Sequence, residues 1–374
     1  MPVKNYLEKV VPQRYLVLDA FRGLAALGVA FGHVKTSGWL STWELATTSY
    51  RLVDFFFVLS GFVIAHANAN KIIFRQITVS RFLVKRFVRL WPLHVFVLLL
   101  LVVHQLVLYA ANAKGLINSP VAFKDEFDSG YLLPNILMIQ AWDILPLATW
   151  NKPAWSVSTE VFAYLIFAVS CVVFRKRVFL ASTAVCVGLL GVIGSDERLM
   201  TATYEGALIR CMAGFTGGVF IYWCRNRLAK LQLPCPLVFE ISILLMVWVG
   251  VTKLPPENGI FVLPIFCVTV LVFSFEAGPV SALLRSRLFV FLGDRSYSIY
   301  MVHAALAIGI FSISAVFGVL GTLESGKTGL LLPPIIADFF LLLYLVMVIL
   351  VSDVTYRWIE MPSLKYGTRL LNRW

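Results

Sequence analysis

Charged side chains are scarce in this sequence. Of its 374 residues, 14% are Asp, Glu, Lys or Arg and 59% are hydrophobic. Soluble domains contain about 25% charged residues. The mean hydropathy is +0.84. This composition excludes an ordinary soluble domain and favours a membrane protein.

The sequence also lacks the patterns of several common classes of protein. Its six cysteines have no spacing typical of a metal site or a redox pair, so we interpret them as packing residues and expect no metal. No Walker loop, Gly-x-Ser-x-Gly elbow or dinucleotide fingerprint occurs. Long polar linkers and internal repeats are absent as well. We therefore predict a single integral membrane domain over residues 1–374.

Long hydrophobic runs are abundant. They measure about 17 to 24 residues, the length that crosses the apolar core of a bilayer as a helix. The segment Tyr131–Trp142 is apolar but too short to cross, which favours a re-entrant or interfacial piece. We predict an all-α membrane protein, a bundle of about ten transmembrane helices at residues 15–34, 52–68, 91–112, 156–174, 178–194, 207–224, 236–252, 259–275, 296–318 and 335–354.

The distribution of positive charge predicts the orientation of this bundle. If the N-terminus is cytoplasmic, the connections on that side carry 21 Lys and Arg residues and the opposite connections carry 8. Lys and Arg accumulate on the cytoplasmic side of membrane proteins. Both termini are therefore predicted to be cytoplasmic. Because the basic residues are spread over short connections, we expect no nucleic-acid partner.

Three ionisable residues, Asp19, Arg22 and His33, lie in the first predicted span. A charge at membrane depth is costly and marks a candidate functional site. Arg22 and His33 are eleven residues apart, which places them on one helix face about 16 Å apart along the axis. The predicted orientation places Arg22 in the cytoplasmic half and His33 at the extracytoplasmic end.

Polar residues at the start of the fourth predicted span have a similar predicted depth. Trp155, Ser156 and Glu160 lie near its extracytoplasmic end, as His33 does in the first span. We predict a contact in which Glu160 orients His33 and stabilises its protonated form, which is a recurrent general-base arrangement. The alternative is that each is an ordinary polar residue at a helix end.

A basic segment precedes the third predicted span. Arg86 and Arg89 share a helix face and could present two guanidinium groups to phosphates. The alternative is an ordinary positively charged cytoplasmic loop. We interpret three other histidines, at positions 66, 94 and 104, as structural. Further embedded polar residues form a supporting set: Asp54, Ser60, Tyr297, Tyr300, His303 and Glu360.

Six segments carry a recognisable pattern in order along the chain: Arg22-x10-His33, Asp54–Phe62, Arg86-x-x-Arg89, Trp155-Ser156-x-x-x-Glu160, Ser296-Tyr297-x-x-Tyr300-x-x-His303 and Glu360-x-Pro362. Together they resemble the motifs of the acyltransferase-3 family of multi-pass membrane O-acyltransferases. The resemblance covers residues 15 to 362. Many members of that family carry an added extracytoplasmic SGNH hydrolase domain, and this chain resembles the stand-alone form.

The resemblance implies an acyl-CoA donor, most often acetyl-CoA, and a hydroxyl acceptor on an extracytoplasmic glycan or glycolipid. It implies a bacterial inner membrane protein that modifies a surface polysaccharide. Arg22, Arg86 and Arg89 would bind the CoA phosphates, His33 would act as a general base or an acyl relay, and Glu160 would orient His33. Acetyl, succinyl and longer acyl groups all fit the family.

Two other classes of function are consistent with embedded charges. One is a transporter of a sugar, lipid or small molecule that uses these residues as a proton relay. The other is an inactive interaction partner. Transport would leave the mass of an acceptor unchanged, whereas acetylation adds one acetyl group to it.

Overall fold

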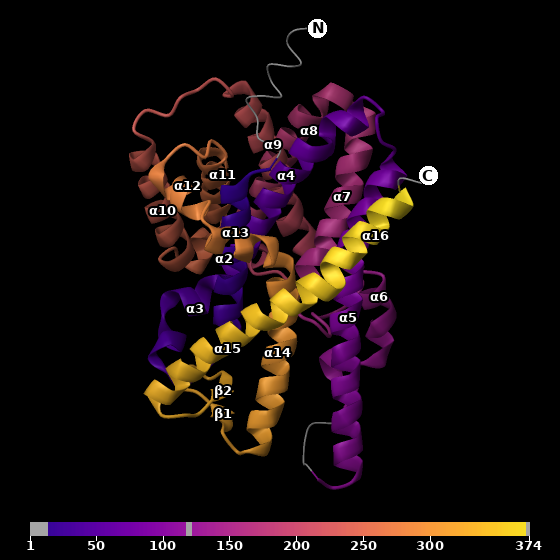
Figure 1. Ribbon diagram of the computed structural model, residues 1–374, viewed down its shortest axis with the longest axis vertical. Helices are drawn as coiled ribbons and strands as arrows, with labels where there is room; N and C mark the ends of the chain where they lie inside the picture. The colour runs from indigo at the N-terminus through magenta and orange to yellow at the C-terminus, as the bar shows by residue number, and fades with distance from the viewer. Residues whose placement is uncertain (1–13, 117–121, 372–374) are drawn as a thin grey trace.

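The computed structural model describes residues 14–116 and 122–371 (Figure 1). The start of the predicted cytoplasmic N-terminal segment, residues 1–13, lies outside this part of the chain. The described residues are almost entirely helical, with one two-stranded hairpin. This confirms the predicted all-α membrane fold.

Ten long helices correspond one by one to the ten predicted ranges. They are α2 (Leu16–His33), α4 (Leu52–Ile73), α5 (Val79–Ala113), α7 (Ala154–Phe174), α8 (Val178–Ser195), α9 (Ala207–Arg227), α10 (Pro236–Thr252), α11 (Val262–Phe273), α14 (Ser296–Val316) and α15 (Pro334–Thr355). Besides short 3-10 turns, five shorter α-helices and one π-helical turn connect or follow them in the described residues: α3 (Glu44–Thr48), α6 (Leu132–Ile136), α12 (Pro279–Leu284), α13 (Arg287–Asp294), the π-helical turn Tyr356–Glu360 and α16 (Met361–Leu371).

The number of membrane spans depends on how bent helices are divided. In the described part of the chain, eight helical stretches are long and apolar enough to cross a membrane. One of them, Ala154–Ser195, comprises both α7 and α8, which a short turn at Arg175–Arg177 separates. Helix α10 is apolar but has only 17 residues. The predicted helices are therefore present, while eight stretches meet the length criterion for a span.

Helix α5 differs most from its predicted range. It was expected to begin at residue 91, after a basic cytoplasmic loop, but it begins at Val79 and has 35 residues. At 1.5 Å per residue it is about 52 Å long, well beyond the hydrocarbon core of a bilayer. Figure 1 shows its C-terminal end projecting past the neighbouring helices. Arg86 and Arg89 consequently lie on a continuous helix and not in a loop.

Glycines allow two pairs of helices to approach until their backbones are in contact. A methyl group on Gly23 of α2 would lie 2.6 Å from the carbonyl carbon of Leu292 in α13. A methyl group on Gly61 of α4 would overlap the carbonyl oxygen of Phe215 in α9. Small residues at such crossings are a common means of packing helices in membranes. These contacts fix α2 and α4, which carry several of the predicted site residues.

A β-hairpin lies at the end of the molecule where α2 ends. Strand β1 (Leu320–Thr322) pairs antiparallel with β2 (Thr328–Leu330), and the segment after α2 joins β2 through Thr36. Ser37 donates to the carbonyl oxygens of both Leu330 and Leu332. Helix α3 lies at the same end (Figure 1). This hairpin is not among the elements predicted from the sequence.

The predicted short segment and two of the predicted structural histidines also have defined places. Tyr131–Trp142 contains the short helix α6, whose Asn135 carbonyl oxygen lies 2.7 Å from the Nε2 atom of His94 in α5. The Nε2 atom of His104 lies 2.9 Å from the Ser312 hydroxyl of α14. Both imidazoles thus join α5 to a neighbouring helix.

A buried ion pair joins α4 to α9. The two oxygens of Asp54 accept bonds from Arg210 Nε and Nη2 at 2.7 and 2.9 Å. Their side chains are 0% and 1% exposed, and the guanidinium also lies 5.3 Å from the ring centre of Trp155. Asp54 and Trp155 therefore contribute to packing and do not line the candidate site described below.

We predict that Asp54→Ala lowers the stability of the protein strongly, because it leaves the Arg210 guanidinium buried without its carboxylate. Breaking such a pair costs about 3 to 5 kcal/mol. Thermal unfolding of the purified protein in detergent measures the effect. The matched control is Asp196→Ala, which removes the partner of the exposed Arg198 and should change stability little. Equal melting temperatures for the two variants would contradict this assignment.

Candidate active site

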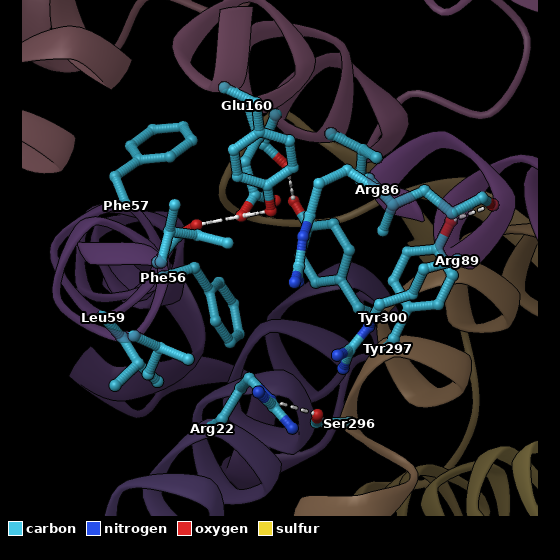
Figure 2. A pocket seen from close by; sticks show the side chains of 17 residues that line it. Arg22, Phe56, Phe57, Leu59, Arg86, Arg89, Glu160, Ser296, Tyr297 and Tyr300 are labelled. Atoms are coloured by element: carbon cyan, nitrogen blue, oxygen red, sulfur yellow. Dashed lines mark hydrogen bonds between the residues drawn. The ribbon is translucent and has the colours of Figure 1, made fainter. Parts of the chain in front are cut away.

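Five helices surround a cavity of about 120 Å³ in the interior of the bundle (Figure 2). Its walls come from α2, α4, α5, α7 and α14. Phenylalanine and aliphatic side chains form one part of its lining, and Figure 2 shows Arg22 and Glu160 on opposite sides of it. We call it the arginine cavity. Its polar lining residues are Arg22, Ser60, Arg86, Arg89, Ser156, Glu160, Tyr164, Ser296, Tyr297 and Tyr300.

Arg22 is held at one wall of the arginine cavity by three oxygen atoms. Its Nε donates to the Ser296 hydroxyl at 2.6 Å and its Nη2 to the Gly293 carbonyl at 3.2 Å. The same Nη2 lies 3.1 Å from Asp19, which also accepts a 2.6 Å bond from Arg14. The close approach of α2 and α13 at Gly23 places Arg22 within reach of these groups. Asp19 thus supports Arg22 from outside the arginine cavity.

Arg86 and Arg89 enter the arginine cavity from α5. Arg86 lies over the ring of Phe82, 5.7 Å from its centre, and its Nε atom is buried without a hydrogen-bond partner. Neither arginine forms an ion pair within residues 14–116 and 122–371. Buried guanidinium groups are normally paired with an acid. Arg86 and Arg89 line the cavity without a carboxylate at ion-pair distance in the described part of the chain, which makes it a candidate place for an anion.

Glu160 contributes the carboxylate of the arginine cavity. The hydroxyl groups of Ser60 in α4 and Tyr164 in α7 both donate to its Oε1 atom. Figure 2 shows these bonds beside the side chain of Arg86, which interacts with Glu160 through charge. One carboxylate therefore faces three guanidinium groups, so the lining carries an excess of positive charge.

A second cavity of about 280 Å³ adjoins the first. It lies at the end of the bundle where α2 begins, and the two cavities share Arg22, Val63 and Arg89. Glu360 lies in its wall, where it accepts a 2.9 Å bond from the Ser298 hydroxyl. A continuous path of polar side chains therefore leads from this end of the molecule to the arginine cavity.

Tyr300 separates the arginine cavity from the two predicted histidines. Its hydroxyl lies 2.8 Å from the Ser156 hydroxyl, and its ring centre lies 5.3 Å from that of Phe56. On its other side the ring centre of His303 is 5.6 Å away, and that of His33 lies 4.6 Å from His303. His33 itself does not line the arginine cavity. Aromatic contacts thus connect the end of the cavity with His33.

The structure does not form the predicted contact between His33 and Glu160. The Nδ1 atom of His33 lies 2.9 Å from the Val29 carbonyl oxygen, and the ring packs against His303. Glu160 lies almost two turns into α7 and is bonded to the two hydroxyl groups described above. The prediction was wrong because similar depth on two helices does not make the helices neighbours. Among the described groups, His303 occupies the position next to His33 that Glu160 was expected to hold.

Tyr297, another predicted site residue, fixes α14 against α5. Its hydroxyl donates a 2.6 Å bond to the carbonyl oxygen of Leu90, and its ring lines the arginine cavity. The bond orients α14 where Ser296 and Tyr300 also face the cavity. Tyr297 and Tyr300, one turn apart, thus present one aromatic face to it.

Several side chains around the site were not identified from the sequence. Arg14 bridges Asp19 and Asp294, with bonds of 2.6 and 2.5 Å, at the second cavity. Lys35 and Lys152 face His33 from the two segments around it. Burial lowers the pKa of Lys35 to about 8, and the nearby charge of Lys327 acts in the same direction. These residues lie outside the helices, so hydropathy alone did not mark them as unusual.

Metal ligands do not gather anywhere in the described part of the chain. No group of three or more His, Cys, Asp or Glu side chains has a metal-binding arrangement there. The six cysteines are free thiols.

The fold and this cavity define a polytopic helical membrane protein with a basic internal site. The family described as "Acyltransferase domain" matches residues 15–357. The chain belongs to this family and is a membrane acyltransferase. The match confirms the resemblance seen in the sequence motifs.

Relatives agree with this assignment. The acyltransferase MdmB of Streptomyces mycarofaciens is 26% identical over 78% of this chain and 80% of its own length. Protein 2 in the picA locus of Rhizobium radiobacter is 33% identical over 42% of this chain and 82% of its own length. A protein of Staphylococcus aureus (strain COL), named as a candidate O-acetyltransferase, is 23% identical over 97% of this chain. The match covers 60% of the length of that relative. No solved structure matches the chain.

We predict that Arg86→Met stabilises the ligand-free protein while it weakens acyl transfer. Replacing a buried ion pair by apolar side chains of similar volume is often neutral or stabilises proteins by about 1 to 4 kcal/mol, and Arg86 has no ion pair to lose within the described residues. Function and stability commonly oppose each other at such sites. The melting temperature in detergent measures the change. The matched control is Arg210→Met, which should lower stability because it leaves Asp54 unpaired. A lower melting temperature for Arg86→Met would contradict the view that Arg86 lacks a partner.

Proposed function

We propose that this protein transfers an acetyl group from cytoplasmic acetyl-CoA to a hydroxyl group of an extracytoplasmic glycan or glycolipid. The observation that carries the proposal is the pair Arg86 and Arg89, which lie in a membrane cavity without a carboxylate of their own. Guanidinium groups bind phosphate oxygens through two parallel hydrogen bonds. The phosphates of CoA would supply the missing negative charge.

The charge distribution supports a cytoplasmic entrance. Helix α2 begins on the side whose connections carry 21 of the Lys and Arg residues, and the connections on the other side carry 8. The second cavity lies at this same, more basic end. A donor from the cytoplasm would meet Arg22 and Arg89 where the two cavities join. This arrangement matches a polyanionic substrate to the basic end of the path.

The dimensions of α2 support a donor that reaches across the site. Arg22 and His33 are about 16 Å apart along the helix axis. An extended pantetheine arm has a comparable length, so phosphates at the arginines would leave the thioester near Tyr300 and the histidines. Its two amide groups need hydrogen-bond partners in the arginine cavity, and the Glu160 carboxylate can accept from one. We assign Glu160 to the donor site on this basis.

The hydrogen bonding of His33 supports a role as general base. Because Nδ1 faces the Val29 carbonyl oxygen, the proton of the neutral ring belongs on Nδ1, and Nε2 keeps its lone pair. Nε2 would take the proton of the acceptor hydroxyl as its oxygen attacks the thioester carbonyl carbon. The bond between carbon and sulfur breaks, and the CoA thiolate finally takes that proton. Exclusion of water would protect the thioester meanwhile.

Membership of the acyltransferase family favours acyl transfer over the transport alternative. The names of two relatives specify acyltransferase or O-acetyltransferase chemistry for those proteins. We extend this chemistry to the present chain, with acetyl as the acyl group and a surface polysaccharide as the acceptor. A bacterial inner membrane location fits both substrates.

We predict a sided reaction in membrane vesicles. Inverted vesicles expose the cytoplasmic face, so added radiolabelled acetyl-CoA should acetylate the enclosed glycan or glycolipid fraction. Right-side-out vesicles should not incorporate label, because acetyl-CoA does not cross the bilayer. The His33→Ala variant should lose activity by about 100- to 10,000-fold in inverted vesicles, the usual contribution of a general base. Parental activity of that variant, or labelling by right-side-out vesicles, would refute the proposal.

We also predict that Arg86→Ala raises the KM for acetyl-CoA. Loss of a charge-assisted hydrogen bond should raise it by about 10- to 100-fold, while acceptor use changes little. Initial rates in inverted vesicles over a range of acetyl-CoA concentrations give this value. The control is Arg198→Ala, an exposed arginine outside both cavities, which should leave KM unchanged. An unchanged KM for Arg86→Ala would remove Arg86 from the donor site.

A further inference from the structure

His33 and His303 form a pair of imidazoles from two different helices. Their ring centres lie 4.6 Å apart, with the edge of one ring toward the face of the other at 77°. His33 is the last residue of α2, and His303 lies within α14. The rings meet beyond Tyr300, at the end of the arginine cavity.

The second ring has an unsatisfied nitrogen atom. His303 is 0% exposed, and its Nδ1 lies 3.3 Å from the Ile299 carbonyl oxygen on the preceding turn. Its Nε2 is buried and has no hydrogen-bond partner in the described part of the chain. Tyr344 of α15 donates to the carbonyl oxygen of His303 at 2.9 Å and fixes the backbone there. A buried lone pair without a donor is unfavourable and is normally avoided.

Two positive groups, Lys35 and Lys152, act on His33 through charge. Within the described residues, the acid paired with either lysine is Glu126, which lies 3.0 Å from Lys152. Lys35 donates instead to the Ala46 carbonyl oxygen at 2.7 Å. An imidazole that gains a proton beside these lysines needs a nearby hydrogen-bond acceptor for its new N–H group. Within the described residues, the unpaired nitrogen of His303 is the acceptor next to His33.

We propose that His303 is the positioning partner of His33, and that its Nε2 accepts a hydrogen bond from His33 once His33 carries the proton of the acceptor hydroxyl. This inference rests on the acyl transfer proposed above. The proposed bond requires one ring to turn about its side-chain torsions, and the ring centres, 4.6 Å apart, are close enough for it. The bond exists only in the protonated state, so it lowers the barrier without binding the resting substrates more tightly.

The proton balance of this step is simple. The acceptor hydroxyl gives its proton to Nε2 of His33 as the new ester bond forms and the thioester bond breaks. The proton then lies between His33 and His303 until the CoA thiolate takes it. Both rings end neutral, as they began. No further reactant is required.

Two amide substitutions separate this role from a structural one. The amide of Gln in His303→Gln reaches the position of Nε2, whereas that of Asn in His303→Asn reaches the position of Nδ1. If His303 receives a hydrogen bond from His33, His303→Gln should retain activity within about 3-fold, and His303→Asn should lose about 10-fold or more in maximal rate. Neither substitution should change the KM for acetyl-CoA, because the proposed bond forms only after His33 takes the proton and therefore does not stabilise the bound donor.

The measurement uses the full-length protein in inverted vesicles, radiolabelled acetyl-CoA as the probe and equal amounts of each variant by immunoblot. Higher activity for His303→Asn than for His303→Gln would show that the Nδ1 contact with α14 matters, and it would overturn the inference. Parental activity for both variants would do so as well, while the proposed function would stand. A raised KM for either would also contradict it. Absence of labelling by the parental protein would overturn the proposed function itself, together with this inference.

Discussion

The electrostatics of the arginine cavity depend on positive charge that the protein leaves unbalanced inside the membrane. Arg22, Arg86 and Arg89 face a cavity whose lining contains one carboxylate, that of Glu160, and within the described residues only Arg22 of the three forms an ion pair, with Asp19 outside the cavity. Two other buried arginines have a carboxylate partner, since Arg210 has Asp54 and Arg295 lies 2.6 Å from Asp353. Buried Arg51 and Arg225 form no ion pair within the described residues. Arg86 and Arg89 differ from these two in lining a cavity, which supports the proposal that they bind a ligand. A charged side chain at membrane depth is energetically costly.

Backbone packing makes this arrangement possible. Gly23 lets α2 lie directly against α13, which brings Arg22 to the Gly293 carbonyl oxygen and the Ser296 hydroxyl. The early start of α5 at Val79 places two arginines on a helix whose direction is fixed by its neighbours. A rigid helix holds a guanidinium group in position at a lower entropic cost than a loop does. On the proposed function, the fold would supply a donor site that is organised before acetyl-CoA binds.

The sequence predicted the helices and most residues of the site but not their lateral neighbours. Hydrophobic runs define helices because every span must satisfy its own backbone in lipid, so all ten ranges correspond to helices. The N-terminal part of α5 is basic and has no such hydropathy signal, so the start of this helix was predicted too late. Likewise Glu160 was assigned to His33 on depth alone. The contact of His33 with His303, and the pairing of Asp54 with Arg210, depend on how α2 meets α14 and α4 meets α9, which hydropathy does not encode.

One measurement tests the central claim most directly: a cryo-electron microscopy structure of the full-length protein with a CoA thioether that cannot be cleaved. The account predicts phosphate oxygens within hydrogen-bond distance of Arg86 and Arg89, and the sulfur end of the arm beside Tyr300 and the two histidines. It also predicts that the ligand enters from the end where α2 begins. Phosphates bound at the opposite end, near Lys35 and the hairpin, would contradict the account, as would an arginine cavity left empty by the ligand.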